Sequence, residues 1–382
     1  MVVLGIIVGL LVLSVLVALH ELGHALAARK NGVIIEEYAI GFPPRLWAKK
    51  LKSGILFAIN ALPIGGYVKL RGEYDSASEK GDYGASGYKA KTKILFAGVA
   101  TNFLLAWLVL SILSVTGLPV ALPNQFRFAD DTVIKSAVTI AALEKDGPAA
   151  RAGLLDGDEI VSLAGEEIAS PVALIKATQA RAGENVPIVV RRANELKTFS
   201  VSIRDKDKSA SQGFTGIYPT QKTWTRTSLY RAPASGLVVT AQFSWETLKG
   251  VGQLIGNFFG GLFQKLSPDE NIRQLGEQNL AKASGSVAGP IGMLGTIFPA
   301  LLSSDITTFF FFVALISLTL AVMNLLPIPG LDGGRWLLMT IFKLCKKPLD
   351  EELESKIQGI GMMVLFGIMI LVVISDVSKI IK

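Results

Sequence analysis

The chain begins with an apolar run that leads directly into a cluster of metal-ligating residues. Residues 2–19 carry no charged side chain, and the sequence His-Glu-Leu-Gly-His follows at positions 20–24. This run predicts a membrane-spanning helix, here over 3–28, because a helix satisfies its backbone hydrogen bonds internally. No Lys or Arg precedes the run, and it is longer than the apolar core of a secretory signal, so we expect an uncleaved span. Chemistry at the cluster would therefore take place within the membrane.

Both histidines of the chain, His20 and His24, lie in this motif. Four residues apart on a helix, they face the same side and can reach one metal ion. Glu21 lies between them, where it can act as general base on a metal-bound water. The alternative is a chance occurrence on an ordinary buried helix, but histidine occurs nowhere else in the chain. The motif therefore predicts a hydrolytic metal site.

The composition agrees with several membrane spans plus a part outside the bilayer. Half of the residues are hydrophobic, and only 18% are charged. The formal net charge is +7, but the basic residues flank apolar runs, a pattern that orients membrane helices. We therefore expect no nucleic-acid partner. The single cysteine, Cys345, cannot form an intrachain disulfide.

Three further apolar segments are long enough to cross a bilayer, over 94–118, 306–326 and 357–374. The loops after the first and third spans are rich in Lys and Arg, which indicates that both are cytoplasmic. Both termini and the long segment between the second and third spans are then outside the cytoplasm. The predicted fold class is an α-helical polytopic membrane protein of four spans with an inserted α+β domain and a membrane-associated β-hairpin.

The segment outside the cytoplasm divides into two parts. Residues 119–205 show strand and helix patterns separated by Gly, Pro and Asp turns, which predicts a compact α+β domain. Residues 206–305 begin with a polar linker and continue with apolar residues at helical spacing over 237–263. An acidic and a basic residue within that helix favour an amphipathic helix on the outer membrane surface over a fifth span. The two parts of the membrane domain are then 1–118 and 306–382.

The first cytoplasmic loop contains an apolar stretch, 54–70, that is too interrupted to span the membrane. Pro63, Gly65 and Gly66 separate two short β-prone runs, which predicts a hairpin or bent strand at the membrane face. Non-helical backbone is tolerated at that depth only if it is buried in protein or lines a wet cavity. The alternative is a surface hairpin with no role in function.

Two histidines leave a zinc site one protein ligand short. Glu36 and Glu37 lack the helical motif of soluble metalloproteases, so the better candidate is Asp332, which follows the third span. Neighbouring Pro and Gly residues break the helix there and let the carboxylate turn inward. An Asp-Gly turn without a ligand is the alternative, but a charge at a membrane boundary is costly unless it coordinates or pairs. Two His and one Asp would also accept other divalent ions.

Together these motifs resemble the site-2 protease family of intramembrane metalloproteases. The motifs are HELGH at 20–24, GVATN at 98–102, NLLPIPGLDGG at 324–334, LPIGGYVKLRGE at 62–73 and GPIG at 289–292. The last two indicate the bacterial RseP-type branch. The resemblance implies Zn²⁺ held by His20, His24 and Asp332, with Glu21 as the catalytic base.

The resemblance also implies a substrate class and substrate contacts. The stretch 54–70 would pair as an edge strand with an unwound substrate segment. The implied substrate-binding residues are Asn102, Asn324, Gly65, Gly66 and Tyr67. The substrates would be single-span membrane proteins already trimmed by another protease, such as an anti-sigma factor or a remnant signal peptide.

Residues 119–205 are similar to a PDZ domain of the permuted bacterial kind. RseP of enteric bacteria has two such domains and this chain has one, so its substrate gating need not match. The implied location is the bacterial cytoplasmic (inner) membrane, with the active site near the cytoplasmic side and the PDZ domain outside. A catalytically inactive membrane PDZ scaffold is the alternative, although it would typically have lost Glu21 or a ligand. A metal transporter would need a pathway across the membrane, and no inverted repeat is visible.

Overall fold

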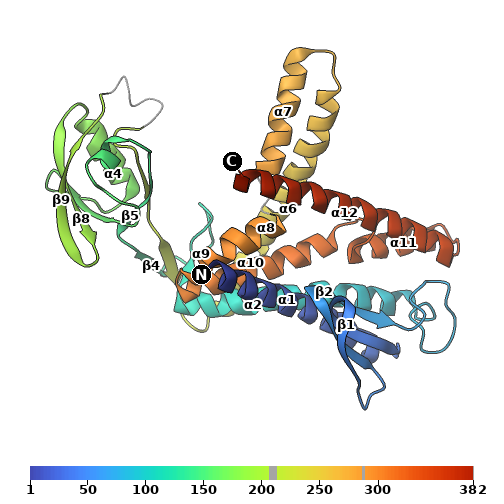
Figure 1. Ribbon diagram of the computed structural model, residues 1–382. Coiled ribbons are helices and arrows are strands. Elements are labelled where there is room, and N and C mark those ends of the chain that lie inside the picture. The colour runs from blue at the N-terminus through green and yellow to red at the C-terminus, as the bar shows by residue number, and fades with distance from the viewer. Residues whose placement is uncertain (206–212, 286–288, 382) are drawn as a thin grey trace. The chain divides into compact units, whose positions relative to one another are not determined.

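The structure, a computed structural model, describes residues 1–205, 213–285 and 289–381 (Figure 1). The chain forms two compact units. The helical unit consists of Met1–Ser114 and Leu229–Lys382, and the sheet unit is Val115–Ser228. Residues 206–212, most of the predicted polar linker, lie outside the described residues.

Among the described residues, four helices of the helical unit are apolar and long enough to cross a membrane, judged by length and composition. They are α1 (Val2–Lys30), α2 (Tyr88–Thr116), α10 (Ile306–Leu325) and α12 (Glu351–Ile381). Each contains most of one predicted span, so the prediction of four apolar helices is confirmed. The bent pair formed by α7 (Glu270–Gly285) and the segment Pro290–Leu302 would add a fifth crossing if it acted as one span.

Residues 237–263, predicted as an amphipathic surface helix, belong to α6 (Ala232–Lys265). This helix is not among the candidate spans. It packs against α10, where Phe243 meets Phe311 edge to face at a centroid distance of 5.5 Å. Its place at the outer membrane surface stays a prediction. The remaining elements of the helical unit are α8 (Pro290–Gly292), the π-helical turn η1 (Met293–Ile297), α9 (Phe298–Leu302) and α11 (Asp332–Leu344).

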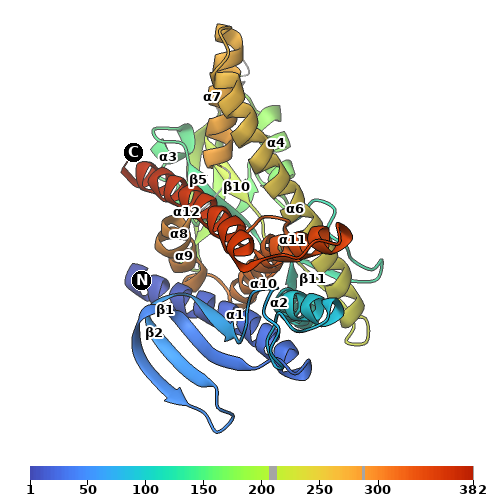
Figure 2. The same cartoon turned by 90° about the vertical axis from the view of Figure 1, so that its right-hand side faces the viewer.

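Helices α1 and α2 run side by side and approach closely at glycines (Figures 1 and 2). A Cβ atom added to Gly23 of α1 would lie 2.5 Å from the carbonyl oxygen of Ala97 of α2. A Cβ atom added to Gly98 of α2 would lie 2.4 Å from Nε2 of His24. Small residues at a helix contact let membrane helices approach in this way. As a result, α2 presses against the side of α1 that carries the histidines.

A folded β-sheet lies beside α1 (Figure 2). It is made of β1 (Ile35–Lys50) and β2 (Leu56–Leu70). The predicted hairpin or bent strand within 54–70 is therefore one bent strand, and its partner is the preceding segment. The bend coincides with Pro63 and with Gly65, whose φ of +115° is a conformation that favours glycine.

The pairing register places the end of β2 at an edge of this sheet. Gly66–Leu70 pairs with Ile35–Ile40, whereas Leu56–Ile59 pairs both with Glu37–Ile40 and with Trp47–Lys50. Leu56–Ile59 therefore lies inside the sheet, whereas Gly66–Leu70 pairs with a strand on one side only among the described residues, and its other side is the free edge of the sheet. The backbone amide of Leu70 is engaged there by a side chain, since it donates to Oε1 of Glu73 at 3.0 Å.

Polar side chains fasten this sheet to the middle of α1. The Tyr38 hydroxyl donates to the backbone oxygen of Ala18, and the Ser14 hydroxyl donates to the backbone oxygen of Pro63 at 2.7 Å. Ser14 lies near the middle of α1, so the bend of β2 reaches deep along that helix. The edge strand is thereby held beside the helical turn that carries the histidine motif.

The sheet unit contains a five-strand path in the order β10-β5-β6-β8-β9, with β7 paired to β6. Its elements are β3 (Leu118–Pro119), β4 (Thr132–Lys135), β5 (Val138–Leu143), α3 (Pro148–Arg151), β6 (Glu159–Leu163), β7 (Glu166–Glu167), α4 (Pro171–Ala180), β8 (Asn185–Arg192), β9 (Glu195–Ser202), β10 (Ile217–Thr220) and β11 (Thr223–Arg226). A second sheet has the order β3-β11-β4. Val186, Ile188 and Val190 alternate along β8 and enter the core, as the two-residue period of a strand requires.

The sheet unit continues past residue 205, where the sequence placed the domain boundary. Strand β10 follows that position and pairs with β5, with Ile217 opposite Leu143. Strand β11 then pairs with β3 and β4. The segment after 205 carries little apolar periodicity of its own, because each of its strands is only four residues long.

A buried ion pair closes the turn before β6. Arg192 donates from Nε to Oδ1 and from Nη2 to Oδ2 of Asp158, each at 2.6 Å. The side chain of Asp158 is only 2% exposed. The hydrogen bonds from Arg192 lower the pKa of the Asp158 carboxyl below its ordinary value. The ionised form of Asp158 therefore stabilises the folded sheet unit.

The stability of the sheet unit should fall in acid because of Asp158. A carboxyl whose pKa is lower in the folded state contributes stability above its unfolded pKa of about 3.9, and this stability is lost as the pH falls through the folded pKa. Asp158→Asn should lower the stability of the sheet unit near pH 7. It should also make that stability depend less on pH below about pH 4. Hydrogen exchange of β6 and β8 in the full chain measures both effects. Asp156→Asn, at an exposed position of the same turn, is the control, and equal behaviour of the two variants would contradict the assignment.

Candidate metal centre

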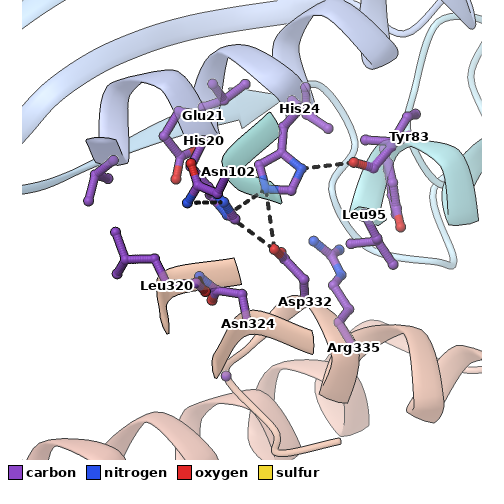
Figure 3. A pocket seen from close by; sticks show the side chains of 15 residues that line it. His20, Glu21, His24, Tyr83, Leu95, Asn102, Leu320, Asn324, Asp332 and Arg335 are labelled. Carbon is purple, nitrogen blue, oxygen red and sulfur yellow. Dashed lines mark hydrogen bonds and ion pairs between the residues drawn. The ribbon is translucent and has the colours of Figure 1, made fainter. Parts of the chain in front are cut away.

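Three side chains from distant parts of the sequence converge beside α1 (Figure 3). His20 and His24 lie one turn apart on α1, and Asp332 is the first residue of α11. The two Nε2 atoms are 3.1 Å apart. Oδ2 of Asp332 lies 3.2 Å from Nε2 of His20 and 3.4 Å from Nε2 of His24. The structure thus brings together the three residues that the sequence nominated as metal ligands.

The three donor atoms fit one face of a tetrahedral zinc site. Zinc bonds of about 2.0–2.1 Å to nitrogen and oxygen correspond to ligand separations of about 3.3–3.4 Å. The observed separations of 3.1, 3.2 and 3.4 Å agree with this to within about 0.2 Å. Oδ2 of Asp332 is buried, and no donor within the described residues makes a hydrogen bond of good geometry to it. This is expected for an atom whose partner is a metal. The residues present therefore fit zinc.

The backbone of α2 orients His24. Nδ1 of His24 lies 2.8 Å from the backbone oxygen of Ile94. A carbonyl oxygen can only accept a hydrogen bond, so Nδ1 carries the proton and Nε2 keeps its lone pair for a metal. Ligating histidines commonly have their other ring nitrogen held in this way.

Gly98 provides the space that the two imidazoles occupy. A Cβ atom at this position would lie 2.4 Å from Nε2 of His24 and 2.8 Å from Cε1 of His20. In the sequence, Gly98 stands out only as part of the motif at 98–102, which predicts no role for it. Its role depends on where α2 crosses α1, and no local pattern in the sequence carries that information.

The donor atoms line a cavity of about 270 Å³ together with Glu21 (Figure 3). Glu21 lies against the free edge of the sheet. A Cβ atom on Gly66 would be 3.7 Å from Cγ of Glu21, and the backbone amide of Val68 faces its carboxylate. The edge strand and the carboxylate therefore share one wall of the cavity.

The predicted substrate-binding residues divide into two groups. Asn102 and Asn324 line the cavity, whereas Gly65, Gly66 and Tyr67 do not. The Tyr67 hydroxyl instead donates to Oε1 of Glu37 at 3.0 Å. On the same strand, Val68 and Leu70 line the cavity, because side chains alternate between the two faces of a strand.

A partly buried charged residue, Arg335, lies beside the centre and was not among the residues predicted from the sequence. Arg335 ion-pairs with Oε1 of Glu354 at 3.1 Å and donates to the backbone oxygen of Glu73. Its guanidinium lies 4.8 Å from the ring centroid of Tyr83, and burial raises the pKa of the Tyr83 hydroxyl. These contacts tie α11 to α12 and to the loop after β2. The spacing of Arg335 and Asp332, one helical turn apart, was the signal that could have identified it.

A family model described as peptidase family M50 matches residues 8–368. The chain belongs to peptidase family M50, the site-2 protease family. Members of this family use zinc, and with its four apolar helices this M50 peptidase is a zinc metalloprotease and a multi-pass membrane protein. The resemblance inferred from the motifs is thereby confirmed.

Curated relatives match this M50 peptidase over nearly its full length. A putative zinc metalloprotease of Nostoc sp. is 28% identical over 386 residues, which cover 98% of this chain and 96% of the relative. A putative zinc metalloprotease of Helicobacter pylori is 28% identical over 389 residues, covering 98% and 99%. The regulator of sigma-W protease RasP of Bacillus subtilis is 24% identical over 455 residues, covering 97% of each chain.

Replacing Gly98 should disrupt the centre without weakening its helix. Alanine favours helix by about 1 kcal/mol over glycine, but in Gly98→Ala the new methyl would overlap the imidazole of His24. We expect zinc affinity and cleavage to fall roughly 10- to 100-fold, as for other changes to groups that orient ligands. Metal analysis and a cleavage assay of the purified chain measure both. Gly250→Ala on α6 is the control because a Cβ there meets nothing within 4 Å. Wild-type zinc affinity in Gly98→Ala would contradict this role.

Proposed function

We propose that this zinc metalloprotease hydrolyses a peptide bond inside the membrane-spanning segment of single-span membrane proteins. The observation that carries the proposal is the convergence of His20, His24 and Asp332 beside an apolar helix, with Glu21 in the same cavity. His20, His24 and Asp332 would hold zinc, and Glu21 would act as the base. The candidate substrates are an anti-sigma factor or a remnant signal peptide, already trimmed outside by another protease.

Peptide hydrolysis needs an activated water and a proton donor for the leaving amine. When bound, zinc supplies Lewis acidity and lowers the pKa of a coordinated water to about 7. Glu21 accepts the proton of the attacking water and returns it to the departing nitrogen, a transfer worth about 10²- to 10⁴-fold in rate. Its position between the donor atoms and the sheet edge lets the carboxylate reach both.

The free edge of β2 provides a place for the substrate backbone. The carbonyl groups of a helix are engaged in internal hydrogen bonds, so the substrate helix must unwind before its peptide bond can be attacked. An unwound segment that adds to Gly66–Leu70 as a further strand regains hydrogen bonds for its freed backbone groups. Substrates with weakly helical residues near the cleaved bond should therefore be preferred.

The sheet unit would select substrates from outside the cytoplasm. We assign it as a PDZ domain of the permuted bacterial kind, located with both chain termini on the outer side of the bacterial cytoplasmic membrane. There it would bind a carboxyl terminus left by an earlier cut, or exclude substrates with bulky external domains. The Bacillus subtilis relative is named a regulator of sigma-W protease, which supports an anti-sigma factor as the first substrate to test.

Glu21→Gln should abolish cleavage and keep the metal. The full chain, purified in detergent, is given a single-span model substrate that lacks its external domain. Wild type should cleave it, and the variant should lose about 10²- to 10⁴-fold in rate while binding one zinc per chain. Glu36→Gln is the matched control, since Glu36 pairs with Lys69 and does not line the cavity. Zinc without cleavage in the wild type, for every substrate offered, would favour the inactive scaffold.

Removal of the metal or of its carboxylate ligand should have the same effect. A chelator should abolish cleavage by wild type, and added Zn²⁺ should restore it. Asp332→Asn should lose most of its zinc, because an amide oxygen is a weaker ligand than a carboxylate. Zinc content and cleavage are measured on the same preparations. One tightly bound zinc in Asp332→Asn would exclude Asp332 as a ligand.

A further inference from the structure

Asn102 lies directly against His20, on the side away from the other donor atoms. Its side chain is completely buried, and Figure 3 shows it beside His20. Nδ2 of Asn102 is 3.5 Å from Nδ1 of His20. Oδ1 of Asn102 is also buried and has no hydrogen-bond partner within the described residues. A buried amide with an unpartnered oxygen is costly, so its surroundings call for an explanation.

A hydrogen bond from α10 holds the backbone of Asn102, and its own helix contacts both histidines through two further residues. The Ser317 hydroxyl of α10, itself fully buried, donates to the backbone oxygen of Asn102 at 3.0 Å. On α2, Gly98 lies one turn before Asn102 and Ile94 one turn before that. Gly98 abuts both imidazoles and Ile94 binds His24. Asn102 therefore completes a line of contacts that α2 makes with the histidines.

The chemistry of a metal-binding imidazole selects one orientation of this amide. The oxygen and nitrogen of an Asn side chain exchange places by a half-turn about the last side-chain bond. With the amino group toward Nδ1, the imidazole would have to accept there and carry its proton on Nε2, the atom that faces Asp332. With Oδ1 toward Nδ1, the imidazole donates from Nδ1 and Nε2 keeps its lone pair for the metal, while Nδ2 takes the buried place that Oδ1 leaves.

We propose that Asn102 is a positioning residue of the metal centre, whose side-chain oxygen accepts a hydrogen bond from Nδ1 of His20. This bond holds His20 in the tautomer that presents Nε2 to zinc. It does for His20 what the backbone oxygen of Ile94 does for His24. The proposal rests on the metal centre proposed above, and it gives Asn102 a role different from the substrate contact expected from the family motif.

Three replacements separate the positioning role from substrate contact. Asn102→Leu keeps the size of the side chain but removes the acceptor, and Asn102→Ala removes the acceptor without bulk. Asn102→Asp keeps an acceptor toward His20. Asn324→Leu is the matched control, because Asn324 lines the same cavity but donates to the backbone oxygen of Leu320 in its own helix.

Zinc affinity of the purified full chain, measured by competition with a chelator, is the deciding readout. We expect the Leu and Ala variants to bind zinc roughly 10- to 100-fold more weakly, and the Asp variant to stay within a few fold of wild type. Asn324→Leu should bind zinc as wild type does. The absorption spectrum of Co²⁺-loaded protein should change in the Leu and Ala variants, because the geometry at His20 relaxes. Size-exclusion profiles identify variants that fail to fold, and the Ala variant replaces the Leu variant in that case.

The outcomes distinguish this proposal from the proposed function. Wild-type zinc affinity in both acceptor-free variants would overturn the positioning role, and a cleavage defect alone would then assign Asn102 to substrate contact. Equal zinc loss in the Asp and Leu variants would also overturn it. If wild type itself bound no zinc, the proposed function would fail first. If wild type bound zinc and cleaved, and the acceptor-free variants bound zinc normally, only the role of Asn102 would fail.

Discussion

The close approach of α2 to α1 is the constraint on which the metal centre depends. Ile94, Gly98 and Asn102 recur every four residues and form one stripe of α2, opposite two histidines with the same spacing on α1. Ile94 contributes its backbone oxygen, Gly98 leaves room for the imidazoles because it has no side chain, and Asn102 contributes its side-chain amide. Two imidazoles fit between the helices only because the middle position has no side chain. Residues with the same four-residue spacing on α1 and α2 thus form a polar pocket between two apolar helices.

Several charged side chains near this pocket have charged partners. Asp332 lies against the two imidazoles, Arg335 ion-pairs with Glu354, and the buried Lys91 ion-pairs with Asp75. The backbone amide of Asp75 also donates to Oε2 of Glu354 at 2.8 Å. Breaking a buried pair leaves an uncompensated charge and costs about 3–5 kcal/mol. The network therefore connects α11, which carries Asp332, to α12, to the loop after β2 and, through Lys91, to α2.

The sequence alone predicted the parts of this protein that rest on local chemistry. Apolar runs identified the four long helices, because a bilayer demands length and apolarity of each helix separately. His20, His24 and Asp332 were nominated as ligands because metal ligation restricts the residue types, and the structure brings the three together. The structure was needed wherever a contact joins distant segments. The role of Gly98 depends on a helix crossing, and that of Arg335 on partners in two other segments.

In the β-strands too, the sequence predicted what depends on local chemistry and missed what depends on pairing between segments. The bend near Pro63 followed from proline and glycine chemistry, but the pairing of β2 with the preceding strand did not. Tyr67 was chosen from its motif, and the alternation along a strand instead turns Val68 and Leu70 toward the cavity. In the sheet unit, β10 was missed because it gains its stability from pairing with β5 rather than from a pattern of its own.

The donor atoms of the centre come from α1 and from α11, near opposite ends of the chain. During synthesis the histidines enter the membrane long before Asp332 leaves the ribosome. The loop contacts and α12, which hold α11 in place through Arg335 and Glu354, are complete only later still. A growing chain would therefore have no third ligand to offer, and the proposed zinc site would be complete only when synthesis is almost finished.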